Sequence, residues 1–120
     1  GPAAPHEAAL RPALLNALIG FIEDRLDDPG LSVARAAAHL GVSKRYVHRL
    51  CEPTGRSFSE HVTDRRLERA LALLTASTPA GRTRPAIAEI AYACGFSDLS
   101  HFNRRFKARF GATPREVRAG

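Results

Sequence analysis

Two short stretches of the chain place arginine, histidine and serine at helical spacing, and both begin in the same way. GVSKRYVHRL covers residues 41–50, and GFSDLSHFNRRF covers residues 95–106. Each begins with Gly, an apolar residue and Ser, and each continues into a segment that carries basic residues. Arginine can donate two hydrogen bonds to a guanine edge, and serine or histidine can supply single hydrogen bonds. These residue types favour the reading of nucleic-acid bases.

The likeness extends to the short segment before each stretch. Ala37 and Ala91 each lie four residues before a glycine, Gly41 in one copy and Gly95 in the other. A small Ala allows two helices to approach closely, and Gly tolerates the positive φ of a tight turn. Each copy is therefore predicted to be a helix-turn-helix. Two copies in register are stronger support for this motif than one.

The second helix of each copy has one apolar and one polar face. Any amphipathic helix has a polar exposed face, so this pattern alone indicates no more than a solvated surface. Here both polar faces are basic, and both lie on the element that a helix-turn-helix inserts into the major groove. The candidates for base contacts are Arg45, His48, Arg49, Ser100, His101 and Arg104. The candidates for phosphate contacts are Lys44, Tyr46, Asn103, Arg105 and Lys107, together with the helix starts at Ser43 and Ser97.

The net charge of +6 is unevenly distributed. Residues 1–40 carry three basic and five acidic residues. Residues 41–69 carry seven basic and four acidic residues, and residues 97–120 carry six basic and two acidic residues. The positive excess thus lies on the two repeated stretches and the residues after them. Clustered arginine is typical of proteins that bind polyanions, although a basic solvated surface remains an alternative.

The apolar periodicity predicts helices throughout, and no segment alternates as a β-strand does. A first helix is expected from Ala8 to about Leu26, before Pro29 and Gly30. Capping boxes are expected at Ser57–Glu60 and Thr113–Glu116. The helix after Ser57, about 28 Å long, is expected to link the two motifs. We therefore expect an all-α protein divided into a flexible lead-in or cleavage remnant (residues 1–7), a first helix-turn-helix subdomain (8–56), a linker helix (57–76) and a second subdomain (77–120).

Several other classes of protein fit this sequence poorly. Cys51 and Cys94 lie far apart on apolar faces, which favours core packing over a disulfide or a metal site. We find no glycine-rich phosphate loop, H-E-x-x-H motif or nucleophile elbow, so we expect no enzyme activity, no cofactor and no metal. His39 and His61 are expected to be surface or hydrogen-bonded histidines. No apolar run could span a bilayer, and we expect a cytoplasmic protein without membrane contact. Because Met is absent, we expect the chain to be a fragment or a processed product.

The run IAEIAYACGFSDLSHFNRRFKARFGATPREVR (87–118) resembles the C-terminal signature of the AraC/XylS family of bacterial transcription regulators. RLERALALL (66–74) is similar to the linker helix of that family, and AAAHLGVSKRYVHRL (36–50) is similar to its first helix-turn-helix. The resemblance covers about residues 10–118. Cys51 departs from the pattern, since the family usually has a large apolar residue there.

This resemblance implies a seven-helix DNA-binding domain with two helix-turn-helix subdomains joined by a long linker helix. It implies recognition helices at about residues 44–52 and 98–109. It also implies a separate sensor or dimerisation domain elsewhere in the regulator and, because members often activate transcription, a surface for RNA polymerase. The residues that contact bases vary in type across the family, so the target sequence does not follow from the resemblance.

We therefore expect sequence-specific binding of double-stranded promoter DNA, with the two recognition helices in successive major grooves. The alternative is a protein-interaction module whose basic surface meets acidic partners.

Overall fold

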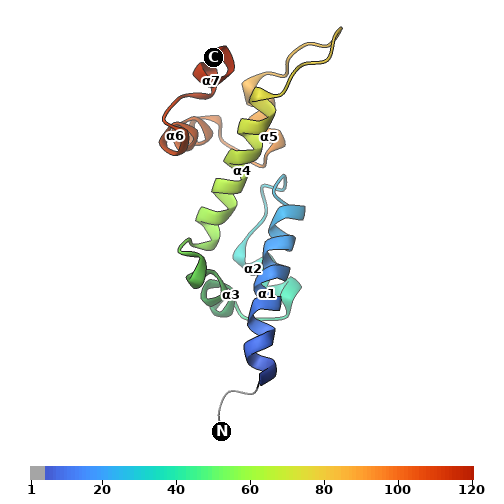
Figure 1. Cartoon of the computed structure of the whole chain (residues 1–120), viewed down its shortest axis with the longest axis vertical. Helices are drawn as coiled ribbons and strands as arrows, with labels where there is room; N and C mark the ends of the chain where they lie inside the picture. The colour runs from blue at the N-terminus through green and yellow to red at the C-terminus, as the bar shows by residue number, and fades with distance from the viewer. Residues whose placement is uncertain (1–4) are drawn as a thin grey trace. The chain divides into compact units, whose positions relative to one another are not determined.

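The computed structural model of the chain describes residues 5–120, with side chains from Leu10 onward. The described residues contain seven α-helices and no strand (Figure 1). The helices are α1 (Pro5–Asp24), α2 (Val33–Leu40), α3 (Lys44–Cys51), α4 (Phe58–Thr75), α5 (Ile87–Ala93), α6 (Leu99–Phe110) and α7 (Pro114–Ala119), with a single 3-10 turn, η1 (Glu52–Thr54), after α3. The expected all-α, seven-helix architecture is confirmed.

Two structural units make up the chain. Unit 1 comprises residues 5–25 and 30–62, and unit 2 comprises residues 26–29 and 63–120. Helix α4 contributes its first residues to unit 1 and the remainder to unit 2. Residues 26–29 belong to unit 2 although they follow α1, the first helix of unit 1.

The core of unit 1 forms where α1, α2 and α3 pack against one another. Small residues on α2, Ala36 and Ala37, are buried and allow the neighbouring helices to come close. Each large side chain withdrawn from water contributes about 1.5–3 kcal/mol, which holds the three short helices together. The buried apolar side chains of this unit are Leu18, Phe21, Ile22, Ala36, Ala37, Val47, Leu50, Cys51, Phe58 and Val62.

The core of unit 2 is built around aromatic side chains. Phe102 and Phe106 of α6 are fully buried, and the ring of Phe102 packs edge-on against that of Phe96, with their centroids 5.0 Å apart. Leu67, Ala70 and Leu74 of α4 join the same cluster, as do the inward residues of α5. Helix α6 is thus fixed on its apolar side, and its other side is left to solvent.

Most helix boundaries agree with the sequence signals, because these signals act locally. The hydroxyl of Ser57 accepts the N–H of Glu60, whose carboxylate accepts the N–H of Ser57. Thr113 and Glu116 form the same reciprocal pair at the start of α7. The side-chain and backbone hydrogen bonds from Thr113 lower the pKa of Glu116, as expected for a group bound in its ionised form.

The ends of α1 differ from the sequence expectation. The helix begins at Pro5, three residues before the expected Ala8, while residues 1–4 lie outside the described residues. Proline is favourable at a first helical position, where its missing N–H has no partner to lose. At the other end α1 stops at Asp24, and Leu26 lies beyond the helix, fully buried as part of unit 2.

Candidate nucleic-acid interface

The turns of the two helix-turn-helix motifs are built from equivalent backbone hydrogen bonds. In unit 1 the N–H of Val42 donates to the carbonyl of Ala37 at 3.0 Å, and in unit 2 the N–H of Phe96 donates to that of Ala91 at 3.1 Å. The glycine of each turn has a positive φ, 70° at Gly41 and 98° at Gly95. The repeat seen in the sequence therefore corresponds to a repeated backbone conformation.

Helix α3 presents the first group of candidate residues. Its N-cap is Ser43, whose hydroxyl accepts the N–H of Tyr46 at 3.0 Å. Val47, Leu50 and Cys51 are buried on its inner face. Burial raises the pKa of the Cys51 thiol, as expected for a core side chain. The following side chains of α3 are exposed: Lys44 in its first turn, and Arg45, His48 and Arg49 further along. The candidate Tyr46 is half-buried between the two faces.

Helix α6 presents the second group. The buried Phe102 and Phe106 define its inner face, and the ring of His101 lies 6.1 Å from that of Phe96 at the helix start. The following candidate side chains are exposed on this helix: Ser100, His101, Asn103, Arg104, Arg105 and Lys107. Thus α6 has the same arrangement as α3, with an apolar face buried in its own unit and a basic face in solvent.

The expected role of Ser97 as a helix start needs correction. Helix α6 begins at Leu99, and its N-cap is Asp98, whose carboxylate accepts the N–H of His101 at 3.1 Å. Ser97 is exposed and precedes the cap. Asp is as good an N-cap as Ser, and the residue inserted into the second copy moves the cap one position along the chain. The Asp98 carboxylate also places a negative charge at the start of α6, which disfavours phosphate binding there.

A half-buried arginine, Arg66, supports the second motif, and sequence reasoning missed it. The Arg66 guanidinium donates to the carbonyls of Leu26 and Asp28, at 2.8 and 2.7 Å. Burial lowers the pKa of Arg66, while the nearby charges of Asp28 and Asp27 act in the opposite direction. A Cβ on Gly95 would lie 2.0 Å from the Leu26 carbonyl oxygen. Because the partners of Arg66 lie 38 and 40 residues away, no local pattern identifies this contact.

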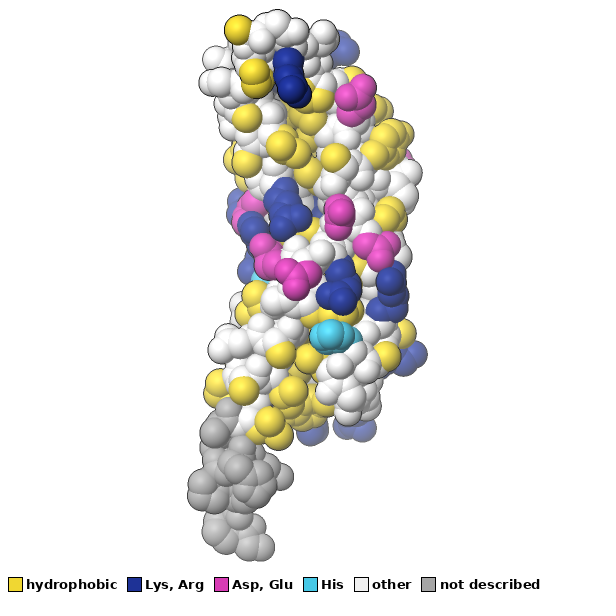
Figure 2. Space-filling view, turned by 90° about the vertical axis from the view of Figure 1, so that its right-hand side faces the viewer, with side chains coloured by type: hydrophobic (Ala, Val, Ile, Leu, Met, Phe, Trp, Pro, Cys, Tyr) yellow, Lys and Arg dark blue, Asp and Glu magenta, His cyan; other side chains and the backbone are white. Residues whose placement is uncertain are grey.

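Other charged residues are paired within unit 2 and lie outside the candidate faces. Glu68 forms ion pairs with Arg65 and with Arg109, the latter at 3.5 Å. Figure 2 shows a face on which Lys and Arg side chains alternate with Asp and Glu. On that face the basic side chains do not form a continuous surface.

Among residues 10–120, whose side chains the structure describes, no cluster of three or more potential metal ligands occurs. In the same range no helix combines the length and apolar character that crossing a bilayer requires. Cys94 is a buried core residue, and burial raises the pKa of its thiol against the opposing effect of Arg69 and Arg66.

Comparison with known proteins agrees with this geometry. A family model described as a helix-turn-helix domain matches residues 36–120. The transcriptional activator RhrA of Rhizobium meliloti is 34% identical over 97 residues, which cover 81% of this chain and 30% of RhrA. The activator RhaS of Escherichia fergusonii is 35% identical over 109 residues, which cover 90% of this chain and 37% of RhaS. The chain thus spans about a third of the length of these curated relatives.

A solved structure is similar over almost its whole length. It is a transcriptional regulator from Chromobacterium violaceum, described as of the kind that contains an AraC-type DNA-binding domain, and it has 33% sequence identity and a TM-score of 0.78. The match covers 92% of this chain and 94% of that one. With two helix-turn-helix motifs, a matching family model and this structural likeness, the chain belongs to the AraC-type helix-turn-helix DNA-binding domains of transcriptional regulators.

Proposed function

We propose that the domain binds a specific double-stranded DNA sequence by inserting α3 and α6 into successive major grooves. The observation that carries this proposal is the presence of two exposed basic helix faces, each on the second helix of a helix-turn-helix. Among the described residues, Arg49 and Arg104 make no ion pair, so their guanidinium groups are available to a ligand. Successive major grooves on one side of B-DNA are about 34–36 Å apart.

The exposed side chains divide into two roles in this proposal. Arg45, Arg49 and Arg104 read guanine edges through two hydrogen bonds, and the smaller or neutral groups of His48, Ser100 and His101 supply single hydrogen bonds. A second group fixes the position of the domain on the phosphates and carries no sequence information. This group comprises Lys44, Tyr46, Asn103, Arg105 and Lys107, with the N–H groups at the Ser43 end of α3.

The full regulator is proposed to act as a transcriptional activator in the bacterial cytoplasm. The relatives RhrA and RhaS are named as transcriptional activators, and this chain spans about a third of their length. We propose that the remaining part of the regulator holds a sensor or dimerisation domain and that the complete protein contacts RNA polymerase. A regulator of this kind binds DNA and performs no catalysis.

Selection of bound sequences from a random duplex pool tests the proposed DNA specificity. The domain is mixed with the pool, bound duplexes are recovered and amplified, and the enriched sequence is compared with its scrambled form in a mobility-shift titration. We expect an enriched site that binds at least about a thousand times more tightly than the scrambled duplex. Equal affinity for the two duplexes would exclude sequence-specific binding. If the domain shifts no duplex at all, the result would favour the alternative function, in which the basic surface binds an acidic protein.

A further inference from the structure

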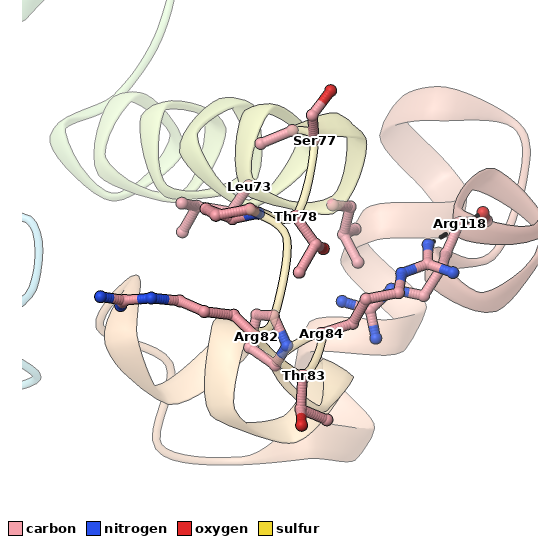
Figure 3. Close-up of a pocket in the computed structure, with 11 residues that line it drawn as sticks. Leu73, Ser77, Thr78, Arg82, Thr83, Arg84 and Arg118 are labelled. Carbon is pink, nitrogen blue, oxygen red and sulfur yellow. Dashed lines mark hydrogen bonds between the residues drawn. The ribbon is translucent and has the colours of Figure 1, made fainter.

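A pocket in unit 2 lies away from the exposed faces of α3 and α6. It is open to solvent on one side and is lined by the last residues of α4, the loop after them and Arg118 of α7, with a volume of about 290 Å³ (Figure 3). Its lining residues are Leu73, Leu74, Ala76, Ser77, Thr78, Pro79, Arg82, Thr83, Arg84, Pro85 and Arg118. The lining contains three arginines and no acidic residue. Its remaining residues are mainly apolar or carry a small hydroxyl group.

Two of these arginines meet at one side of the pocket. A terminal nitrogen of Arg84 donates to the backbone carbonyl of Arg118 at 3.3 Å, and Figure 3 shows the Arg84 side chain extending toward Arg118 while Arg82 extends the other way. The Nε atom of Arg118 is buried and has no hydrogen-bond partner among the described residues. Because this Nε is closed to solvent, the positive charge faces the pocket through the exposed parts of the arginine side chains. With no acidic residue in the lining, an anion in the pocket would neutralise that charge.

The other side of the pocket is apolar. Leu74 belongs to the core of unit 2, and its neighbour Leu73 is 47% exposed, which is high for a leucine. Pro79 and Pro85 lie at the two ends of the loop segment that lines the pocket. A bare inorganic ion would not use this apolar surface, whereas a molecule with both an anionic group and an apolar body would use both sides. The volume is at the small end for ligand pockets, which favours a compact molecule over a peptide chain.

We propose that this pocket binds a small organic anion, with its carboxylate or other anionic group on Arg84 and Arg118 and its apolar body against Leu73 and Leu74. The anionic group accepts hydrogen bonds from the guanidinium groups of Arg84 and Arg118 and neutralises their charge. This site is independent of the proposed DNA contacts, because none of its lining residues belongs to α3 or α6.

Hexanoate is a suitable probe, because it combines a carboxylate with a compact apolar chain. The 15N-labelled domain is titrated with hexanoate, with hexan-1-ol as the uncharged counterpart and with inorganic phosphate as the anion without an apolar body. We expect saturable amide shifts in residues 73–85 and in α7 with hexanoate, and much weaker ones with the other two probes. If hexanol gives shifts as large as hexanoate does, the arginines do not contribute to binding and the proposal is wrong. If phosphate gives equal shifts, the pocket binds inorganic anions without using its apolar side, which also contradicts the proposal. Shifts confined to α3 and α6 would place the anion on the DNA-binding faces, and the absence of saturable shifts would exclude the site.

Matched arginine variants test the assignment of the anion contacts. Arg84→Gln and Arg118→Gln should each weaken hexanoate binding about tenfold, the effect of losing one charge-assisted hydrogen bond. Arg115→Gln, which removes an equal charge from an exposed position on α7 outside the pocket, should leave the affinity unchanged. Because Arg84 is exposed, Arg84→Gln should keep the native amide spectrum. Its hexanoate affinity therefore tests the proposal even if Arg118→Gln unfolds. Equal losses in Arg84→Gln and Arg115→Gln would show an effect of net charge alone and overturn the proposal.

Discussion

At the scale of single residues, arginine has two opposite roles in this domain. Arg49 and Arg104 lie in solvent on the outer faces of α3 and α6, whereas Arg66 turns inward and binds two backbone carbonyls. Guanidinium groups in solvent are available to bases, because binding does not require them to give up protein partners. The half-buried Arg66 supports the backbone beside the second turn. The position of each arginine therefore decides its role, since the residue type is the same.

Replacement of the exposed arginines should reduce specific binding most. Arg49→Ala or Arg104→Ala is expected to cost about 1–3 kcal/mol on the enriched site and much less on scrambled DNA, because a contact with a guanine edge is lost. Arg11→Ala removes the same charge from an exposed position on α1 and serves as the control. Fluorescence anisotropy titrations with both duplexes measure the difference. Equal losses of binding free energy on the two duplexes would show that these arginines contact phosphates and not bases.

The turn of the second motif should tolerate no side chain at Gly95. Gly95→Ala would combine a φ of 98° with a Cβ placed 2.0 Å from the Leu26 carbonyl oxygen. We expect a loss of more than about 2 kcal/mol in the free energy of unfolding, since backbone atoms have to move. Gly41→Ala is the matched control, because its φ is also positive but its Cβ would meet no atom within 4 Å. Urea denaturation of both variants measures this, and equal losses would contradict the close approach at Gly95.

At the scale of helices and turns, the sequence predicted what is encoded locally. The caps at Ser43 and Thr113 and the stop at Gly41 follow from residues within one turn of the helix end, and the structure confirms them. The start of α6 was misplaced by one residue, because Ser97 and Asp98 are both good caps and the sequence alone does not choose between them.

Features that depend on distant residues were beyond sequence reasoning. Leu26 was assigned to the first helix by its periodic spacing, yet it is buried in unit 2, where Arg66 binds its carbonyl. The pocket beside α7 brings together α4, a loop and Arg118, which are adjacent only after folding. Which base or phosphate each candidate residue contacts likewise depends on the target DNA, and the protein sequence does not specify the target sequence.

The cap of α3 should contribute to both stability and recognition. Ser43→Ala removes the acceptor for the N–H of Tyr46 and should lower the free energy of unfolding by about 1 kcal/mol. Because the capped end carries Lys44 and Arg45, specific DNA binding should weaken as well. Ser59→Ala, at an exposed position within α4, is the control for loss of a hydroxyl. Thermal denaturation and anisotropy measure the two effects, and wild-type stability in Ser43→Ala would show that the cap has no energetic role.

At the scale of the whole molecule, the basic charge predicts a strong dependence of binding on salt. Lys44, Arg105 and Lys107 are the charged candidates for phosphate contacts. Three neutralised phosphates give a slope of about −2.7 in a plot of log binding constant against log salt concentration. Arg105→Ala should reduce this slope by about one, on enriched and scrambled duplexes alike, whereas Arg11→Ala should not change it. A slope near zero would exclude phosphate binding as the main source of affinity.

The central claim is that two recognition helices read DNA together, and methylation interference tests it most directly. Guanine N7 is an acceptor in the major groove, so its methylation blocks the pairing of arginine with that base. On the enriched site we predict two groups of interfering guanines, one helical turn or about 10 base pairs apart, and loss of one group in Arg49→Ala and of the other in Arg104→Ala. A single group of interfering guanines, or two groups that both persist in each variant, would contradict the account.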